Sequence, residues 1–152
     1  MAHLFFKPRS ILVPVKGTNA DREAFRLACG LARDSKSKLY ALYVIEVKRE
    51  LPVDAEIAGE TVKGEEILAG IEALSAEEKC PVSAEILQSR LAGPAVVHEV
   101  VERGVDLVIM GAPHKRQGSS FRLGGTISYI LKNAPCPVLL WREHGLNGGG
   151  RA

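Results

Sequence analysis

The segment Gly111–Thr126 concentrates residue types that suit an anionic ligand. It contains Lys115, Arg116 and Arg122 and no acidic residue, whereas the whole chain has a net formal charge of only +2. The positive excess of the chain therefore lies in this segment, and a phosphate or carboxylate group is its natural partner. The same small net charge does not favour broad binding to nucleic acid or to an anionic membrane. We therefore expect no nucleic-acid partner and no direct membrane insertion.

Two glycines stand where a short helix is expected to begin. Gly124 and Gly125 remove side chains there, so the backbone N–H groups of Gly125, Thr126 and Ile127 can meet a phosphate at the positive end of the helix dipole. Alternatively, the glycines only turn the chain, Thr126 caps the helix and the basic residues keep a loop solvated. Spacing and charge favour neither interpretation over the other.

A second polar group follows the first expected strand, because Lys16, Gly17 and Thr18 come directly after the apolar run Ile11–Val15. In an open parallel sheet, ligands bind beyond the carboxyl ends of the strands where the strand order reverses, which brings this turn towards Gly111–Thr126. Lys16 either reaches an anionic group or is a solvated lysine at a strand end. The expected ligand-binding residues are Val15, Lys16, Gly17, Thr18, Val44, Met110, Gly111, His114, Lys115, Arg116, Gly124, Gly125, Thr126 and Ile127.

Other chemistry lacks its usual residue patterns. The chain has no GxSxG elbow, Walker loop or HExxH motif, and no histidine pair has metal spacing. Cys29, Cys80 and Cys136 lie far apart, which favours reduced, mostly buried thiols over a disulfide framework or a zinc site. Residues 1–9 do not resemble a signal peptide. We expect a cytoplasmic protein that is not an enzyme and has no catalytic or metal-binding residues, although slow nucleotide hydrolysis is left open.

Apolar runs and helical periodicity alternate along the chain. The expected strands are Ile11–Val15, Lys38–Val47, Val82–Leu87, Val105–Met110 and Pro137–Trp141. The expected helices run over Asn19–Arg33, around Ile67–Leu74, from Gly93 to Gly104 and from Ile127 to Ala134. This alternation predicts an α/β fold with a five-stranded parallel sheet and helices on both faces, flavodoxin-like and doubly wound, in the strand order 3-2-1-4-5. We expect one domain over residues 1–143 and a disordered, glycine-rich tail over residues 144–152.

The segments ILVPV with the Gly17–Thr18 turn, VDLVIMG and GTISYILKNAPCPVLL together resemble the universal stress protein family, over Ser10–Trp141. The resemblance implies the fold described above, of the adenine nucleotide alpha hydrolase-like type, with adenine-nucleotide binding in one branch of the family. That branch carries a glycine, a second glycine after two residues, and a Gly-Ser or Gly-Thr pair after nine more. Gly111 fits the first position and His114 occupies the second.

Two features of this chain depart from the nucleotide-binding branch. Gly125 and Thr126 fit the final pair only if the loop has gained one residue. Lys16 stands where the branch usually has an acid that accepts hydrogen bonds from the nucleoside, and a lysine cannot accept. Lys16 therefore either reaches a phosphate or carboxylate of an altered ligand or marks a site that has lost nucleotide binding.

We expect a stress-response or regulatory protein that binds ATP, another adenine nucleotide or a related anion. The alternative is a dimeric interaction module that does not bind nucleotide, and a further possibility is the regulation of a membrane transporter. A homodimer is expected through the last strand, Val138–Trp141, because so apolar an edge strand is otherwise an aggregation hazard. Burial of this strand by the protein's own helices is the other interpretation.

Overall fold

The apolar runs of the sequence form one parallel sheet in the order β3–β2–β1–β4–β7, which confirms the predicted order. Its strands are β1 (Ser10–Pro14), β2 (Lys38–Glu46), β3 (Ser83–Ser89), β4 (Leu107–Ala112) and β7 (Val138–Arg142). This computed structural model describes residues 6–114, 116–117, 120–121 and 123–143, of which 116–117 and 120–121 by their backbone only. The tail predicted over residues 144–152 lies outside the described residues.

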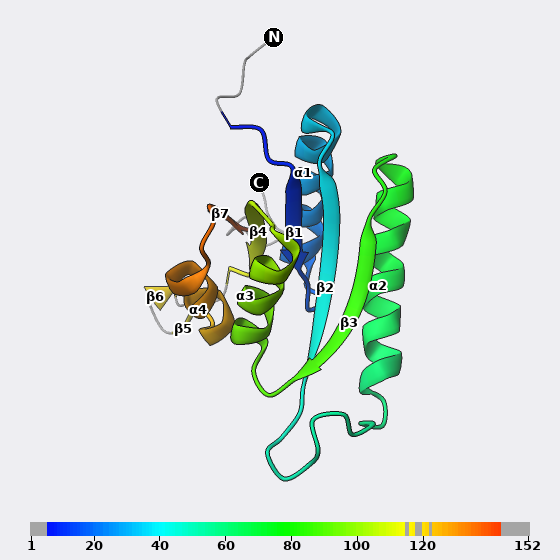
Figure 1. Cartoon of the computed structure of the whole chain (residues 1–152), viewed down its shortest axis with the longest axis vertical. Helices are drawn as coiled ribbons and strands as arrows, with labels where there is room; N and C mark the ends of the chain where they lie inside the picture. Colours follow the sequence, from blue (N-terminus) through cyan, green and yellow to red (C-terminus); the bar gives the residue numbers. More distant parts are fainter. Residues whose placement is uncertain (1–5, 115, 118–119, 122, 144–152) are drawn as a thin grey trace.

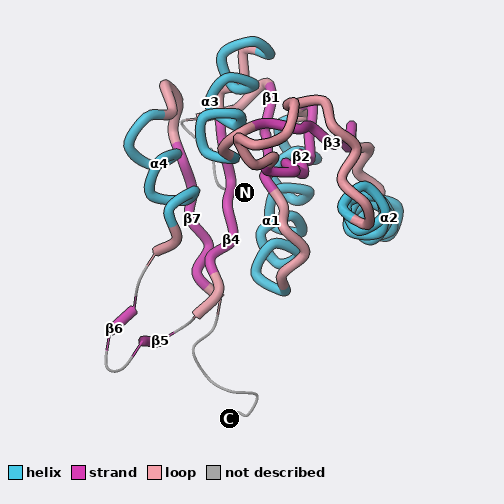
Figure 2. Tube along the Cα trace, turned by 90° about the horizontal axis from the view of Figure 1, so that it is seen from below, coloured by secondary structure: helices cyan, strands magenta, loops and turns pink. Residues whose placement is uncertain are grey.

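Four helices cover the sheet, two on each face. Helices α1 (Asn19–Ser35) and α2 (Glu60–Glu77) lie on one face, and α3 (Ala92–Arg103) and α4 (Gly125–Asn133) lie on the other (Figures 1 and 2). In the described part of the chain, none of the helices has the length and the apolar character needed to cross a membrane.

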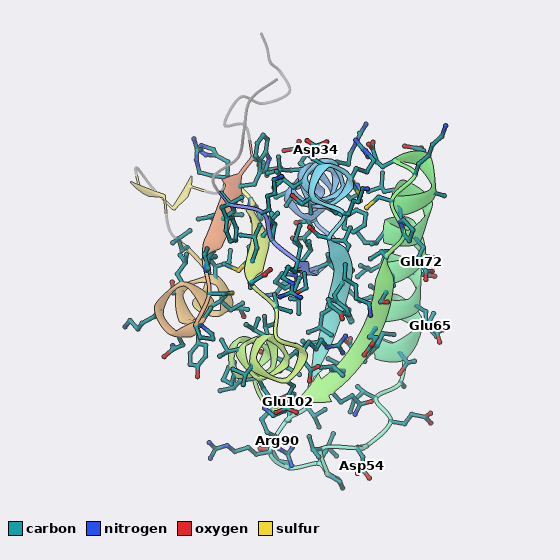
Figure 3. The ribbon with its side chains drawn as sticks, turned by 45° about the horizontal axis from the view of Figure 1, so that its top comes forward. Asp34, Asp54, Glu65, Glu72, Arg90 and Glu102 are labelled. Carbon is teal, nitrogen blue, oxygen red and sulfur yellow. The ribbon has the colours of Figure 1, made fainter. Side chains whose placement is uncertain are left out.

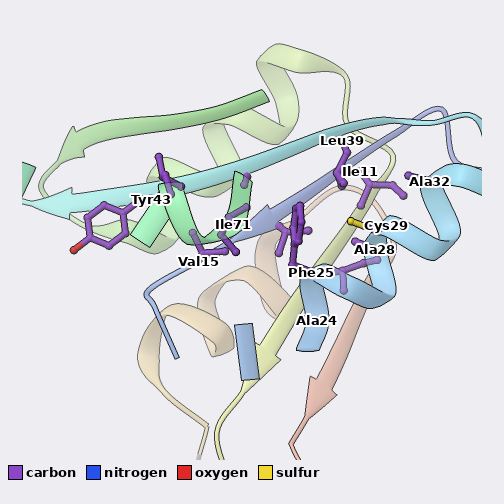
Figure 4. Packing of buried hydrophobic residues seen from close by; sticks show 14 of the residues in the cluster. Ile11, Val15, Ala24, Phe25, Ala28, Cys29, Ala32, Leu39, Tyr43 and Ile71 are labelled. Carbon is purple, nitrogen blue, oxygen red and sulfur yellow. The ribbon is translucent and has the colours of Figure 1, made fainter. Parts of the chain in front are cut away.

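Each face of the sheet has its own hydrophobic core. Ile11 and Val13 pack with α1 and α2, whereas Leu12 packs with α3 and α4, and all three side chains are fully buried. Figure 4 shows part of the first core, in which Phe25 and Cys29 of α1 lie beside the strands. Strand β1 is therefore buried on both faces, as its continuous apolar run indicates.

The structure differs from the sequence-based expectation at two places. The segment expected to be a loop, residues 111–125, contains a short antiparallel ribbon of β5 (Arg116–Gln117) and β6 (Ser120–Phe121), which lies apart from the main sheet in Figure 2. Strand β4 starts at Leu107 rather than Val105, because the Val105 N–H still bonds to the Val100 carbonyl at the end of α3. Asp106 then accepts from the backbone N–H of Ser10, at 3.0 Å, and so ties the starts of β4 and β1 together.

Strand β7 is an edge of the sheet, and its two faces differ in exposure. Along β7, Val138 and Leu140 pack into the second core, whereas Leu139 and Trp141 face the other side and are 42% and 41% exposed. The Trp141 Nε1–H donates to Oε1 of Glu23 on α1 at 2.7 Å. The helices of the chain therefore cover β7 only in part.

The long connection between β2 and α2 is held by two side chains rather than by secondary structure. Nη1 of Arg90 donates to the carbonyls of Lys48 at 2.6 Å and Leu51 at 2.7 Å, and Figure 3 shows Arg90 beside this connection. Nε2 of Gln88 donates to the carbonyls of Val53 and Ala55. These donors satisfy backbone carbonyls that no sheet or helix serves.

We predict that Gly64→Ala lowers the free energy of unfolding by about 1–3 kcal/mol, because overpacking a filled core forces neighbours to move. A Cβ atom at Gly64 would lie 2.8 Å from Cδ2 of Tyr43 and 3.1 Å from Cδ1 of Ile86. The matched control is Gly70→Ala in the same helix, where a Cβ atom meets nothing within 4 Å. This control should raise the free energy of unfolding by up to about 1 kcal/mol through helix propensity. Urea denaturation checks both values, and equal effects of the two substitutions would contradict the packing assigned to α2.

Candidate functional site

A pocket of about 480 Å³ opens at the carboxyl ends of β1 and β4, next to the first turn of α4. Its volume lies within the usual range for small-molecule sites. Because β1 has β2 on one side and β4 on the other, the pocket lies at the point where the strand order reverses, which is where open parallel sheets bind ligands. The pocket is lined by Pro14, Lys16, Thr18, Asp21, Met110, Gly111, Pro113, Leu123, Gly124, Thr126, Ile127 and Ile130.

Half of the residues expected at the site lie on this pocket: Lys16, Thr18, Met110, Gly111, Gly124, Thr126 and Ile127. Val15 and Gly17 instead line a neighbouring pocket of about 200 Å³, which α1 and α2 border. Val44 packs at the border of the second core, away from both pockets. Lys115 and the side chain of Arg116 lie outside the described residues.

His114 is directed away from the pocket. Its backbone N–H donates to Oε1 of Glu143 at 3.1 Å, and its Nδ1 contacts the Arg142 guanidinium at the end of β7. Pro113, the residue before it, lines the pocket in its place. The second glycine position of the nucleotide-binding pattern is thus occupied by a residue that joins β4 to the end of β7.

The first turn of α4 presents open backbone donors to the pocket. Gly124 is the N-cap, with φ −70° and ψ 163°, and no side chain caps the helix. The alternative in which Thr126 caps the helix is therefore wrong, since Thr126 lies one residue inside it. The first N–H groups of a helix have no partner within it, and a Cβ atom on Gly124 or Gly125 meets nothing within 4 Å. Gly124, Thr126 and Ile127 line the pocket, whereas Gly125, which was also expected at the site, does not.

Gly111 serves packing as well as the pocket wall. A Cβ atom on Gly111 would lie 2.3 Å from the carbonyl oxygen of Ala20 in the first turn of α1. Only glycine therefore permits the first turn of α1 to lie this close to β4. This requirement holds whether or not a ligand is bound.

The turn after β1 folds around the carboxylate of Asp21. The backbone N–H groups of Lys16, Gly17 and Thr18 all donate to Oδ2 of Asp21, at 2.6, 3.0 and 3.2 Å. The Asp21 N–H in turn donates to Oγ1 of Thr18 at 3.1 Å, so that Thr18 and Asp21 form a capping box at the start of α1. Gly17 adopts a φ of 99°, a backbone conformation that favours glycine. Lys16 itself is exposed at the mouth of this turn.

Asp21 is the acid in the pocket wall, and it is only 5% exposed. Burial raises the pKa of its carboxyl, while hydrogen bonds from the Lys16, Thr18 and Gly17 backbone and from the Thr18 hydroxyl act in the opposite direction. Asp21 is absent from the site residues expected from the sequence, because its spacing from Thr18 is that of a capping box. The available signal was an acid in the first turn of a helix that starts at the strand-order reversal.

The cysteines do not form a second reactive centre in the described part of the chain. Cys29, Cys80 and Cys136 are all unpaired, and Cys29 and Cys80 are buried. Burial, together with the neighbouring Cys80, raises the pKa of the Cys29 thiol to about 12. A thiol of this kind is a poor nucleophile because the thiolate is scarce near neutral pH. Among the described residues, no group of three or more His, Cys, Asp or Glu side chains could hold a metal ion.

Several known proteins are similar to this chain in sequence or in fold. A universal stress protein of Methanocaldococcus jannaschii is 27% identical over 141 residues, which cover 89% of this chain and 82% of the relative. The universal stress protein of Archaeoglobus fulgidus, solved in complex with dAMP, is 14% identical with a TM-score of 0.71, covering 89% of this chain and 98% of that one. A universal stress protein family protein of Arabidopsis thaliana, solved with AMP bound, is 18% identical with a TM-score of 0.64, covering 90% and 93%.

These structural likenesses establish the fold, which agrees with the sheet order and helix placement described above. The family model of the universal stress proteins matches residues 7–142, and so includes every strand and helix of the main sheet. The chain therefore belongs to the universal stress protein family.

Proposed function

We propose that this protein is a non-catalytic regulatory module that binds an adenine nucleotide, ATP or a close relative, in the pocket between β1, β4 and α4. The observation that carries the proposal is the first turn of α4, which has no side-chain cap and which contributes Gly124, Thr126 and Ile127 to the lining of the pocket. Such a helix end binds phosphate through its orphan N–H groups and its dipole. Lys16 lines the same pocket and supplies a positive side chain.

The relatives support an adenine nucleotide over other anions. The Archaeoglobus protein was solved with dAMP and the Arabidopsis protein with AMP. The pocket of this chain also has apolar walls at Pro14, Met110 and Ile130, which suit a flat heterocycle better than an inorganic ion. We propose that the nucleotide binds with its phosphate groups at α4 and its base near the apolar wall.

A second candidate function is a dimeric interaction module with no nucleotide. Two observations favour it: Lys16 stands at the end of β1 and offers only donors, and His114 is held at the end of β7 instead of leaving space for a phosphate. The two candidates differ in one measurable property, the affinity for nucleotides. For both we propose a cytoplasmic location, which the three unpaired cysteines support.

We predict that Gly125→Val weakens ATP binding at least tenfold, because a branched side chain in the first turn of α4 hinders the approach of a phosphate to the N–H groups of that turn. A Cβ atom at Gly125 meets nothing within 4 Å, and its φ is not positive, so the fold should tolerate the change. Gly30→Val in α1, away from the pocket, is the matched control and should leave the affinity unchanged. Calorimetry with ATP, ADP, AMP and cyclic dinucleotides measures the affinities.

Lys16→Asp separates the two candidates. If the wild-type protein binds none of these nucleotides at millimolar concentration while Lys16→Asp binds one, the site has lost its ligand and the second candidate is correct. Binding by the wild-type protein that Gly125→Val leaves intact would contradict the placement of the phosphates at α4.

We also propose a homodimer in which two β7 strands pair antiparallel about a two-fold axis. Strand β7 is an edge of the sheet, and it exposes Leu139 and Trp141 on the face next to α1. An exposed apolar edge strand is a template for pairing with another chain, and two identical edges can cover each other.

We predict that light scattering at micromolar concentration gives twice the chain mass of 16.4 kDa for the wild-type protein. Leu139→Lys should shift the mass towards the monomer, because a charged side chain on the edge opposes pairing. Val62→Lys makes a similar change at an exposed residue of α2 and should leave the dimer intact. A wild-type monomer, or a dimer that Leu139→Lys does not weaken, would rule out this interface.

A further inference from the structure

The backbone of the turn uses the two oxygens of the Asp21 carboxylate unequally. All three backbone N–H groups of the turn donate to Oδ2, and none of them donates to Oδ1. A carboxylate has about four acceptor positions on its two oxygens, so Oδ1 keeps acceptor capacity even with the Thr18 hydroxyl close by. Asp21 lines the pocket, so a ligand there can approach its carboxylate.

Asp21 lies between the two pockets at the end of β1 and lines both of them. Among the described residues that line the larger pocket, it is the one acid and Lys16 is the one base. The remaining lining is apolar or neutral. A ligand in this pocket therefore meets a single strong acceptor, and it meets that acceptor on the wall formed by the first turn of α1.

The capping role of Asp21 does not account for Oδ1. The capping box and the turn use Oδ2 and the Thr18 hydroxyl, which a neutral amide side chain could satisfy equally well. Burying the charged group instead carries a desolvation cost, which appears as a raised pKa of the Asp21 carboxyl. A charged carboxylate in the wall of a pocket can also accept a hydrogen bond from a ligand in that pocket, and the capping role does not use this capacity.

The wall formed by α4 and the carboxylate of Asp21 favour different groups of a ligand. The first turn of α4 offers N–H donors and a positive dipole end, which attract the anionic part of a ligand and repel a donor cation. Asp21 has the opposite preference, since it repels phosphate and accepts from O–H or N–H groups. A ligand that suits both carries phosphate at one end and hydroxyl or amino donors at the other.

We propose that Asp21 is the residue that recognises the nucleoside, with Oδ1 accepting a hydrogen bond from a sugar hydroxyl or a base amino group of the bound nucleotide. This inference rests on the proposed function. The side chain of Lys16, at the end of β1, has no acceptor atom, and Asp21 in the first turn of α1 is the carboxylate on this wall of the pocket. Asp21 thereby sets the preference for a nucleotide over an inorganic phosphate chain.

The test compares ATP with inorganic tripolyphosphate on the wild-type protein and on Asp21→Asn. Asparagine keeps a carbonyl oxygen for the turn and puts an amino group in the place of Oδ1, so the pocket-facing acceptor becomes a donor. We expect ATP to bind the wild-type protein more tightly than tripolyphosphate. We expect Asp21→Asn to weaken ATP at least tenfold and to leave tripolyphosphate unchanged or bound more tightly, because a negative charge is removed from the pocket wall.

Asp34→Asn is the matched control, since Asp34 is an exposed residue in the last turn of α1, at the outer end of the helix in Figure 3. It makes the same charge change and should alter neither affinity. Thermal denaturation reports whether Asp21→Asn stays folded. A loss of affinity for both ligands by the same factor would assign Asp21 to capping alone and overturn the inference.

A second measurement does not depend on any variant. ATP analogues that each lack one donor, the 2′-hydroxyl, the 3′-hydroxyl or the 6-amino group, are titrated into the wild-type protein. One of them should lose at least fivefold in affinity, and that analogue should lose nothing further on Asp21→Asn. If the wild-type protein binds all of them, and tripolyphosphate, as tightly as ATP, the inference is wrong while the anion site stands. If it binds neither ATP nor tripolyphosphate, the proposed function fails as well.

Discussion

The contact between Gly111 and the first turn of α1 positions the whole site. Gly111 has no side chain, so the Ala20 carbonyl oxygen can lie only 2.3 Å from the position that a Cβ atom would take. Any other residue would collide with this oxygen. This contact places the start of α1 against the end of β4, and the turn from β1 to α1 must then close within a few residues. The Asp21 carboxylate closes it by accepting three backbone N–H groups, from Lys16 to Thr18. The pocket is the space left between this turn and α4.

Most of the fold could be predicted from the sequence because the sheet is buried on both faces. Continuous apolar runs such as Ile11–Val15 mark such strands, and their alternation with helices restricts the order of a parallel sheet to few choices. The β5–β6 ribbon could not be predicted, since its short strands lie in a polar segment without alternating apolar residues. Val105 was misassigned because it is buried yet bonds to the end of α3, so burial there does not indicate strand pairing.

The position of the candidate site was easier to predict than its lining. Local charge and the Gly124–Gly125 pair pointed to the correct loop, because these features are local in sequence. Apolar lining residues such as Pro14, Leu123 and Ile130 carry no signal that separates a pocket wall from the core. Asp21 was missed for a different reason. Its position three residues after a threonine is fully explained by a capping box. Only the three-dimensional structure shows that a single carboxylate oxygen, Oδ2, accepts the hydrogen bond from the Thr18 backbone.

The register of the sheet connects the pocket to the exposed edge. Gly111 is the pairing partner of Trp141 across β4 and β7, and the Trp141 indole donates to Glu23, two residues after Asp21 on α1. The helix that carries the buried acid therefore touches the edge strand directly, through one hydrogen bond, and through β4 as well. The close approach of α1 to β4 at Gly111 and the Trp141–Glu23 hydrogen bond thus fix the start of α1 at two points, one on the strand that lines the pocket and one on the exposed edge strand.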